Sequence, residues 1–365
     1  MLSPLTDRAF SLSEAIARSG IEWQRFDWFN DDRPIKMTPL APDFDLTCHP
    51  DDRRQRLEAW RKNCGAPVAL NMTGPPSENA DDSRALVVLN WNVWIGHGRL
   101  RQLIWRIRNG DFADHGATPD AGLVVLAQEV YRSDAAIPLV GSKHAASRPA
   151  TRAGHQREEI VDTALALGMN LRYAPSMRNG SLQSDRGNAI LSTMPLEDAY
   201  AIELPFTVQR RVVVAATVRV AGASVSVVSA HLDPRGPPGH RWLGANARAF
   251  QARYLVESLR TDTVVLGADL NLTRGKSEPA WRILQDAGFR QEIASASPNW
   301  RHTYHAMPRL VLDHVLVRDP TGIIARADVH RLDEHPLDRG SLVFGSDHHP
   351  LLARIEVATA SAATA

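Results

Sequence analysis

The pattern of hydrophobic and polar positions changes near residue 86. From there onward, short apolar runs rich in Val, Leu and Ala end in polar or turn-forming residues, which is typical of buried β-strands. These runs predict strands at 86–91, 123–128, 188–193, 211–220, 224–232, 263–270, 312–317 and 351–357.

Other segments have the spacing of helices that bury one side. In 242–260, for example, Leu243, Ala247, Phe250 and Leu255 lie close to one stripe. The strand candidates between 188 and 232 follow one another without helices, so a simple parallel βαβ array does not fit. The expected fold is an α/β sandwich of two mixed β-sheets packed face to face, with helices on the outer faces. Helices are predicted at 98–109, 155–167, 242–260 and 279–287.

The first 84 residues have a different texture, rich in Pro, Asp, Arg and Trp. Helices are plausible at 10–19 and 50–63, and the Gly-, Pro- and acid-rich stretch 73–83 has the composition of a linker. We therefore expect three parts, listed by residue: an N-terminal extension and linker at 1–84, a main domain at 85–357 and a flexible tail at 358–365.

Composition narrows the class of protein. The 42 Lys and Arg residues nearly balance the 41 Asp and Glu residues, so no bulk charge marks a nucleic-acid binder. Two cysteines, Cys48 and Cys64, provide neither a disulfide framework nor a zinc pattern. The N-terminus has no signal-peptide pattern and the chain has no long apolar run. We expect a cytoplasmic protein without a membrane segment.

Polar residues that can bind metal lie at the ends of the predicted strands, before or after the apolar run. One such residue usually caps a turn, but a whole series is harder to explain structurally, because buried carboxylates are costly unless they are paired or bound to metal. The series comprises Asn92, Gln128 and Glu129, His231 and Asp233, Asp269 and Asn271, Asp313 and His314, and Asp347, His348 and His349.

The residue types select the chemistry. Carboxylates, amides and imidazoles without thiolates favour Mg²⁺, Mn²⁺ or Ca²⁺ over a closed zinc site. The chain contains neither a GxSxG nucleophile motif nor a phosphate-binding GxxxxGK[ST] loop. The mechanism that remains for this set of residues is hydrolysis by metal-activated water.

An ordered series of short motifs resembles the deoxyribonuclease I-like endonuclease/exonuclease/phosphatase superfamily. The motifs are WNV (91–93), LAQE (126–129), GNAILS (187–192), HLD (231–233), GADLN (267–271), LDHVLV (312–317) and SDHHPL (346–351). The resemblance covers roughly 86–357. It implies an Mg²⁺-dependent phosphoric ester hydrolase, in which Mn²⁺ is expected to substitute for Mg²⁺.

The resemblance also implies residue roles. Glu129 resembles the principal Mg²⁺ ligand, with Asn92 and Asp347 near the metal. Asp269 resembles the residue that orients or deprotonates the attacking water. Asn271 resembles the amide that holds phosphoryl oxygens.

Further roles follow from the same resemblance. His348 resembles the catalytic histidine and Asp313 the carboxylate that orients it, so the two should lie within hydrogen-bond reach. His231 resembles a second histidine of the deoxyribonuclease-like members, and Arg211 a phosphate-contacting arginine. Trp94 departs from the abasic endonucleases, which carry an acidic residue at that position, and makes an abasic-site enzyme less favoured.

The substrate stays open between classes. Arginine-bearing loops at 143–157 and 233–241 favour a nucleic-acid phosphodiester, DNA or RNA, cut by an endonuclease or exonuclease. The alternative is a small-molecule or lipid phosphodiesterase or phosphatase. A third reading is a binding module without catalysis, which the complete residue set disfavours.

Overall fold

The computed structural model describes residues 22–25, 62–72, 84–119, 121–138, 146–147, 157–179, 182–207, 209–234, 244–291, 302–305, 307, 310–334 and 342–358. The helix expected at 10–19, nearly all of the helix expected at 50–63, the linker 73–83 and almost all of the expected tail lie outside these residues.

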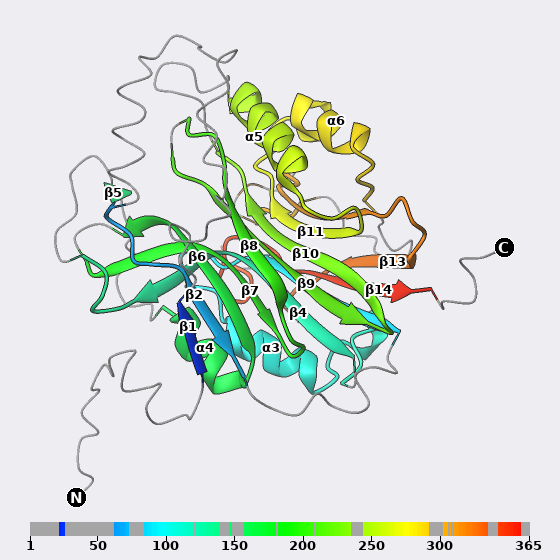
Figure 1. The fold of residues 1–365 in the computed structure, drawn as a ribbon, viewed down its shortest axis with the longest axis horizontal. Helices are drawn as coiled ribbons and strands as arrows, with labels where there is room; N and C mark the ends of the chain where they lie inside the picture. The colour runs from blue at the N-terminus through cyan, green and yellow to red at the C-terminus, as the bar shows by residue number, and fades with distance from the viewer. Residues whose placement is uncertain are drawn as a thin grey trace, which may run out of the picture.

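Two mixed β-sheets form the centre of the molecule (Figure 1). The larger, nine-stranded sheet has the order β1-β2-β6-β7-β4-β3-β14-β13, with β5 paired to β6. Its strands are β1 (Glu22–Arg25), β2 (Val68–Asn71), β3 (Ala85–Asn92), β4 (Gly122–Ser133), β5 (Ala146–Ser147), β6 (Asn170–Asn179), β7 (Ser184–Ser192), β13 (Ile324–Arg331) and β14 (Leu351–Val357).

The smaller, five-stranded sheet has the order β12-β11-β10-β9-β8. It combines a parallel pair, β10 and β11, with antiparallel neighbours. Its strands are β8 (Glu197–Glu203), β9 (Val212–Val220), β10 (Ala223–His231), β11 (Val264–Asp269) and β12 (Asp313–Arg318).

Helices cover both outer faces, which confirms the expected α/β sandwich. Apolar residues of α3 and α4 pack on the larger sheet, and those of α5 and α6 pack on the smaller one. A third apolar cluster lies between the sheets. In Figure 1 the two helix pairs stand on opposite sides of the strands. The helices are α3 (Leu100–Arg108), α4 (Ile160–Leu167), α5 (Gly244–Ser258) and α6 (Pro279–Asp286).

The predicted strands and helices from residue 86 onward are all present, with shifted ends. β7 begins at Ser184 and β4 continues to Ser133, both beyond the predicted runs. The pattern missed β1, β2, β5, β6, β8 and β13. β6 is fully buried although its sequence, NLRYAPSMRN, contains two arginines and a proline, so no apolar run signalled it.

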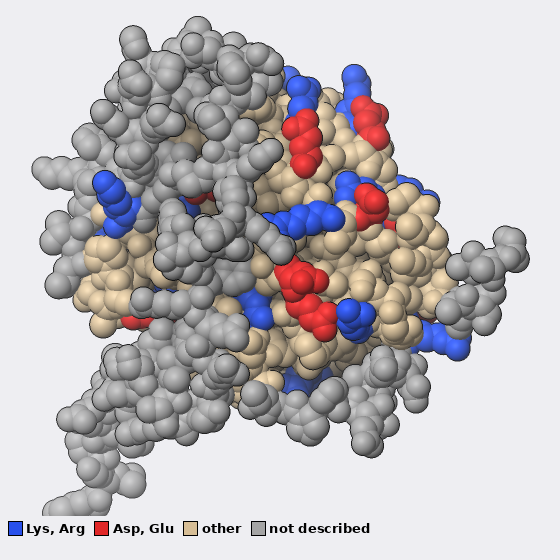
Figure 2. Space-filling view, viewed as in Figure 1, with Lys and Arg blue, Asp and Glu red and all other residues tan. Residues whose placement is uncertain are grey.

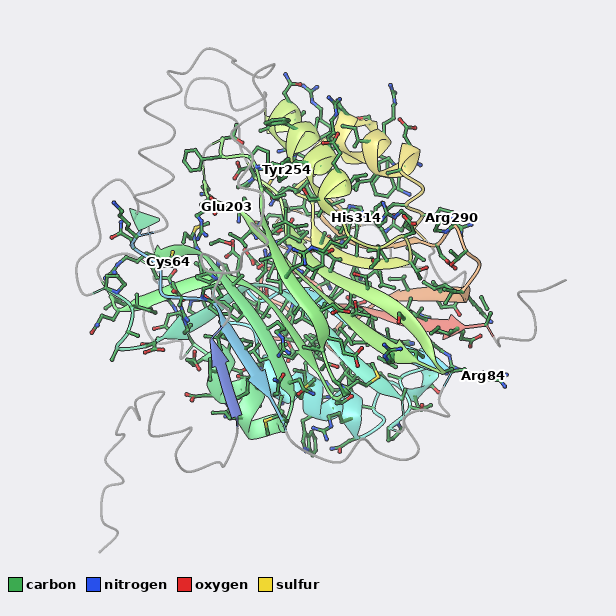
Figure 3. All side chains as sticks on the ribbon, viewed as in Figure 1. Cys64, Arg84, Glu203, Tyr254, Arg290 and His314 are labelled. Atoms are coloured by element: carbon green, nitrogen blue, oxygen red, sulfur yellow. The ribbon has the colours of Figure 1, made fainter. Side chains whose placement is uncertain are left out.

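Part of the N-terminal segment belongs to the larger sheet. β2 pairs with β6, and Gly65 N donates to Asp185 Oδ2 at 2.8 Å. Cys64, a buried free cysteine, lies at this side of the molecule (Figure 3). Residues 62–72, which we assigned to an extension, are therefore continuous with the main domain.

The two sheets approach each other closely near the ends of β11 and β3. A Cβ atom at Gly267 of β11 would lie 2.7 Å from Asn90 Oδ1 of β3 and 2.7 Å from Leu126 Cδ1 of β4. Only glycine fits this approach, because a buried contact of that length forces neighbouring atoms apart. The close approach brings the ends of β11 and β3 together.

Candidate active site

Three predicted site residues form a row across the smaller sheet. His231 at the end of β10 is in register with Asp269 of β11, and Asp269 is in register with Asp313 of β12. From the opposite sheet, Asn92 Nδ2 donates to Asp269 Oδ2 at 2.9 Å. Residues far apart in sequence therefore meet at one edge of the sandwich.

His348 completes this row from the segment that precedes β14. Its Nδ1 lies 2.7 Å from Asp313 Oδ2, which confirms the predicted pairing. Trp91 Nε1 donates to His348 O at 2.8 Å and holds the segment in place. Burial alone would lower the pKa of His348, but the charge of Asp313 and its hydrogen bond, with Asp269 and Asp347 nearby, raise that pKa to about 10. The ring is therefore an imidazolium at neutral pH.

Asp269 is the most contacted carboxylate of the site. Its Oδ1 accepts from Asn271 N at 3.0 Å, and its Oδ2 lies 3.3 Å from His231 Nε2 and 3.9 Å from His348 Nε2. Burial, followed by the charge of Asp313, raises the pKa of Asp269 to about 7. A carboxyl group of this kind can exchange a proton near neutral pH.

His231 is held as a neutral donor. Arg211 Nη1 lies 3.1 Å from His231 Nδ1, and a guanidinium can only donate, so the ring proton resides on Nε2, which faces Asp269. Burial and then the charge of Arg211 keep the pKa of His231 well below its usual value.

Arg211 lies elsewhere than we expected. Its guanidinium is buried behind His231, and its Nε donates to Asp233 Oδ1 at 3.2 Å. This geometry suits a residue that orients His231 rather than one that reaches a phosphate.

Glu129 sits on a β-bulge. The pairing of β4 with β7 slips between Ala127 and Val130, and Glu129 has a left-handed φ of 52°. Gln128 points inward, where its Nε2 donates to Asn90 Oδ1 at 2.9 Å. A bulge changes the direction in which a side chain points, and here it separates Glu129 from the interior.

Asp347 provides the clearest test of whether a cation fits. Its Oδ1 is buried and has no hydrogen-bond partner among the described residues. Burial raises the pKa of Asp347 to about 6, and the nearby negative charge of Glu129 adds to the effect. A carboxylate with an unpartnered buried oxygen beside a second carboxylate is a donor set that a hard divalent cation prefers, so the residues fit Mg²⁺.

A second acidic group has metal-like spacing. Ligand atoms of Asp269, Asp313 and His348 lie within 4.8 Å of one another. We favour a proton-bearing network here, because His348 is protonated and already hydrogen-bonded to Asp313.

Two residues near the site escaped the sequence pattern. Tyr304 packs against His348 with ring centroids 4.9 Å apart, and its pKa is raised by burial and by Asp347, Asp269 and Glu129. Arg186 Nη1 lies 4.0 Å from Glu129 Oε2. Tyr304 has no strand-end signal, whereas Arg186 directly precedes the GNAILS motif.

Two other strand-end histidines face away from the row. His314 packs against Trp281 of α6 with ring centroids 5.1 Å apart, on the helix-covered side of the smaller sheet (Figure 3). His349 Nδ1 faces Leu332 O at 3.2 Å. The alternation along an extended chain explains why each neighbour of a site residue is turned away.

Comparison with protein-family models matches residues 89–348 to the Endonuclease/Exonuclease/phosphatase family. The chain belongs to this family. Members of the endonuclease/exonuclease/phosphatase family are hydrolytic phosphoesterases, and the expected resemblance is confirmed. No curated protein matches the chain.

One solved structure supports the fold, and two others are similar to the chain over a comparable length. The catalytic domain of human Nocturnin with bound sulfate aligns at a TM-score of 0.50 and 16% identity, over 76% of this chain and 96% of that one. An endonuclease/exonuclease/phosphatase from Beutenbergia cavernae aligns at 0.49 and 20%, over 75% and 72%. Sphingomyelinase C from Streptomyces griseocarneus aligns at 0.42 and 18%, over 74% and 99%. Within the described part of the chain, no helix is long and apolar enough to cross a membrane.

Proposed function

We propose that this chain is a divalent-metal-dependent hydrolase that cleaves a phosphodiester with water, and that the diester belongs to a nucleic acid. The observation that carries the proposal is the row of His231, Asp269, Asp313 and His348 beside the unsatisfied carboxylate of Asp347. Buried polar atoms are normally hydrogen-bonded, so an unpartnered carboxylate oxygen inside this group of residues supports a cation ligand.

Glu129 and Asp347, with Asn92 nearby, would hold the cation, and Mn²⁺ would substitute for Mg²⁺. When bound, the cation neutralises phosphate oxygens and stabilises the leaving oxyanion. Arg186 limits the negative charge beside Glu129, which keeps the carboxylate cluster from repelling an anionic substrate.

Asp269 is the proposed base that accepts the proton of the attacking water. Asn92 and His231 both direct hydrogens at its Oδ2, so they fix the carboxylate and stabilise its ionised form. Arg211 acts indirectly, because its hydrogen bond sets the tautomer of His231.

His348 supplies positive charge next to the reacting phosphate. Asp313 holds its ring plane and keeps it protonated, so His348 can donate to an oxygen that gains charge in the transition state. Asn271 Nδ2 already donates to Leu232 O at 3.0 Å, and its second N–H would bind a phosphoryl oxygen.

The nucleic-acid proposal rests on arginine-bearing segments rather than on a large positively charged surface. The segment 233–241 follows the His231 strand directly and contains Arg235 and Arg241. On the face shown in Figure 2, described Lys and Arg side chains alternate with Asp and Glu. Substrate recognition is therefore assigned to local contacts near the site.

The test is a substrate panel with matched variants. Single- and double-stranded DNA, RNA, sphingomyelin, bis-p-nitrophenyl phosphate and p-nitrophenyl phosphate are incubated with chelator-treated protein and added Mg²⁺ or Mn²⁺. We expect metal-dependent cleavage of nucleic acid and of the synthetic diester, abolished in Asp269→Asn. Cleavage of sphingomyelin alone would replace nucleic acid by a lipid, and hydrolysis without any metal requirement would overturn the mechanism.

Glu129→Gln tests the cation directly. The change keeps side-chain volume and removes the charge that binds Mg²⁺. We expect activity to be lost at low Mg²⁺ and partly restored at high Mg²⁺ or by Mn²⁺. Superimposable metal titrations of the variant and the unaltered protein would refute the role of Glu129.

A further inference from the structure

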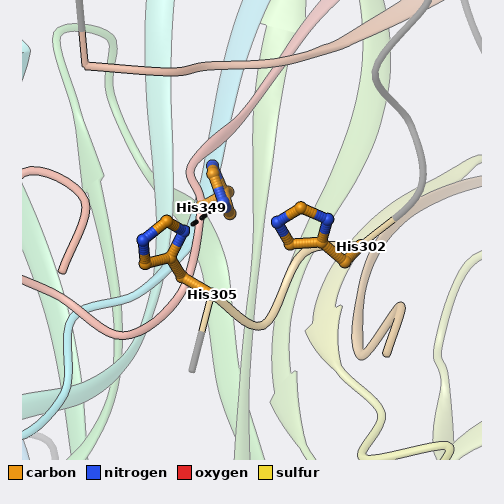
Figure 4. A group of neighbouring side chains, drawn as sticks. All are labelled: His302, His305 and His349. Carbon is orange, nitrogen blue, oxygen red and sulfur yellow. Dashed lines mark hydrogen bonds between the residues drawn. The ribbon is translucent and has the colours of Figure 1, made fainter. Parts of the chain in front are cut away.

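Three histidines from two segments meet beside the segment that carries His348 (Figure 4). His302 and His305 come from the 302–305 segment, and His349 follows His348 directly. The ring of His349 lies 5.1 Å from that of His302 and 5.0 Å from that of His305, between centroids. Each residue offers one ring nitrogen, and these nitrogens lie within 4.8 Å of one another.

The tautomer of His349 follows from its surroundings. Its Nδ1 faces two acceptors, Leu332 O at 3.2 Å and Asp333 Oδ1 at 3.0 Å, so Nδ1 carries the proton in the neutral ring. Nε2 then presents a lone pair, 3.1 Å from His305 Nδ1. A histidine whose far N–H is held by a carboxylate or carbonyl is the arrangement that orients metal-bound imidazoles.

The local charge is mixed. Arg331 is the nearby positive group: its Nη1 lies 3.5 Å from His302 Nδ1 and donates to His302 O at 3.0 Å, and its Nη2 donates to Asp333 Oδ2 at 2.9 Å. The carboxylate of Asp333, which also faces His349 Nδ1 at 3.0 Å, offsets part of this positive charge. His302 and His305 are half-buried, whereas His349 is buried.

We propose that His302, His305 and His349 bind one divalent transition-metal ion of the zinc class, with Asp333 orienting His349. Imidazole nitrogens suit Zn²⁺, Co²⁺, Ni²⁺ and Cu²⁺, whereas Mg²⁺ requires oxygen ligands. This site is distinct in chemistry from the oxygen-lined Glu129 and Asp347 site. The hydrogen bond between His305 and His349 joins two rings, whereas a metal ion joins all three.

The bound ion would clamp two segments that reach the active site. His305 N donates to Asp347 O at 2.7 Å, and His349 N donates to Thr303 O at 2.8 Å, so the segments are already paired by backbone. Tyr304 and His348 lie between these bonds and form a β-bridge. The ion acts by fixing this pairing, not by contacting the substrate.

The test uses the untagged full chain, freed of metal by a chelator and titrated with Co²⁺ in excess Mg²⁺. Absorption of bound Co²⁺ in the visible range reports nitrogen ligation, and Zn²⁺ should displace it. We expect one Co²⁺ per chain, bound at least tenfold more weakly in His302→Gln and in His305→Gln. Asp333→Asn should weaken binding about 10- to 100-fold, the usual effect of losing an outer-shell partner.

Two controls separate this site from other effects. His115→Gln removes a half-buried histidine that stacks on His330 at 4.6 Å, outside the cluster, and should bind Co²⁺ as the unaltered chain does. Glu129→Gln should also leave the Co²⁺ spectrum unchanged. Circular dichroism checks that each variant is folded, and Zn²⁺ should raise the melting temperature of the unaltered chain but not of folded His305→Gln.

Three results would overturn the proposal: no Co²⁺ bound in the presence of Mg²⁺, unchanged binding in folded His302→Gln and His305→Gln, or loss of the spectrum in Glu129→Gln, which would place the ion at the active site. None of these readouts measures phosphodiester hydrolysis. Failure of this inference and failure of the proposed function are therefore distinguishable.

Discussion

At the residue scale, the site depends on two groups whose pKa values are both raised. Burial and Asp313 raise the pKa of Asp269 to about 7, whereas Asp313, Asp269 and Asp347 overcome burial and raise that of His348 to about 10. An ionised Asp269 beside a protonated His348 is then the state populated just above neutral pH. Groups with displaced pKa values are the usual mark of acid–base roles.

The first prediction concerns the His348–Asp313 pair. His348→Ala should lower kcat by about a hundredfold or more, the scale on which general acid–base groups contribute. Asp313→Asn should resemble it, since the carboxylate acts mainly through the ring, and the double variant should be little worse than either single variant. Steady-state kinetics on a synthetic diester measures all three.

His349→Gln is the matched neighbour for this prediction. Its ring faces Leu332 and Asp333 rather than the row, so kcat should fall far less than in His348→Ala. For the His348–Asp313 pair, a double variant His348→Ala/Asp313→Asn whose loss of kcat equals the product of the two single losses would contradict the idea that the two residues act as one unit.

The second prediction concerns pH. Asp269 accepts a proton only when ionised, and its pKa is raised, so kcat/KM should fall as pH drops through about 7. It should fall again as His348 loses its proton near pH 10. A bound divalent cation lowers the pKa of nearby carboxylates, so the acidic limb should move to lower pH as Mg²⁺ increases. If the acidic limb of the pH profile stays at the same pH at every Mg²⁺ concentration, Asp269 does not lie close enough to the bound cation to be affected by it.

At the scale of the elements, strand β4 shows how local strain positions a functional side chain. The bulge between Ala127 and Val130 places Glu129 in the left-handed region, which costs a residue with a Cβ roughly 1–2 kcal/mol. The strain persists because β3 and β7 hold the strand on both sides. Backbone strain of this kind is often concentrated at functional sites.

The third prediction compares two substitutions at this position. In an ordinary strand, Gly is less stable than Ala by about 0.5–1 kcal/mol. At residue 129 the order should be reversed, with Glu129→Gly about 1 kcal/mol more stable than Glu129→Ala, because only Gly adopts this φ without strain. Urea unfolding measures the difference. Both variants should lose metal-dependent activity, and an Ala variant as stable as the Gly variant would remove the strain argument.

At the scale of the whole molecule, the larger sheet extends into the N-terminal segment. β2 covers the edge of β6, and Val68 and Leu70 are buried in the core against α4 and the larger sheet. Arg132, which forms a buried ion pair with Asp185, also donates to Ala66 O at 2.6 Å. This strand therefore contributes to the stability of the domain that contains the site.

The fourth prediction concerns truncation. A chain beginning at Lys62 loses the four-residue edge strand β1 but keeps β2, and it should fold with metal-dependent hydrolysis intact. A chain beginning at Ser83 loses β2, including two buried apolar side chains worth about 2 kcal/mol each, and exposes the edge of β6. Its melting temperature should be clearly lower, or the protein insoluble. If the two proteins are equally stable, residues 62–72 are an accessory segment that does not stabilise the main domain.

Much of the site could be predicted because each of its strands is an apolar run with polar residues at or next to one end. The Asp313–His348 contact was foreseen from the family resemblance, across 35 positions of sequence. β6 could not be predicted, because most partners of its buried arginine Arg172 are distant in sequence, among them Asn71 Oδ1 at 2.7 Å and Leu196 O at 2.8 Å. A polar residue whose partners lie elsewhere in the fold looks, in sequence, like a loop residue.

The sequence by itself determined the strands and helices around the site, the residue types at their ends and the oxygen-rich character of the predicted metal ligands. Only the tertiary structure decided the protonation states of Asp269, His231 and His348, because desolvation and the charges of neighbours from other strands set them. Only the tertiary structure also brought His302 and His305 to His349. Their spacing in sequence carries no sign of this contact, since the distance between side chains depends on how the 302–305 segment packs against the segment before β14.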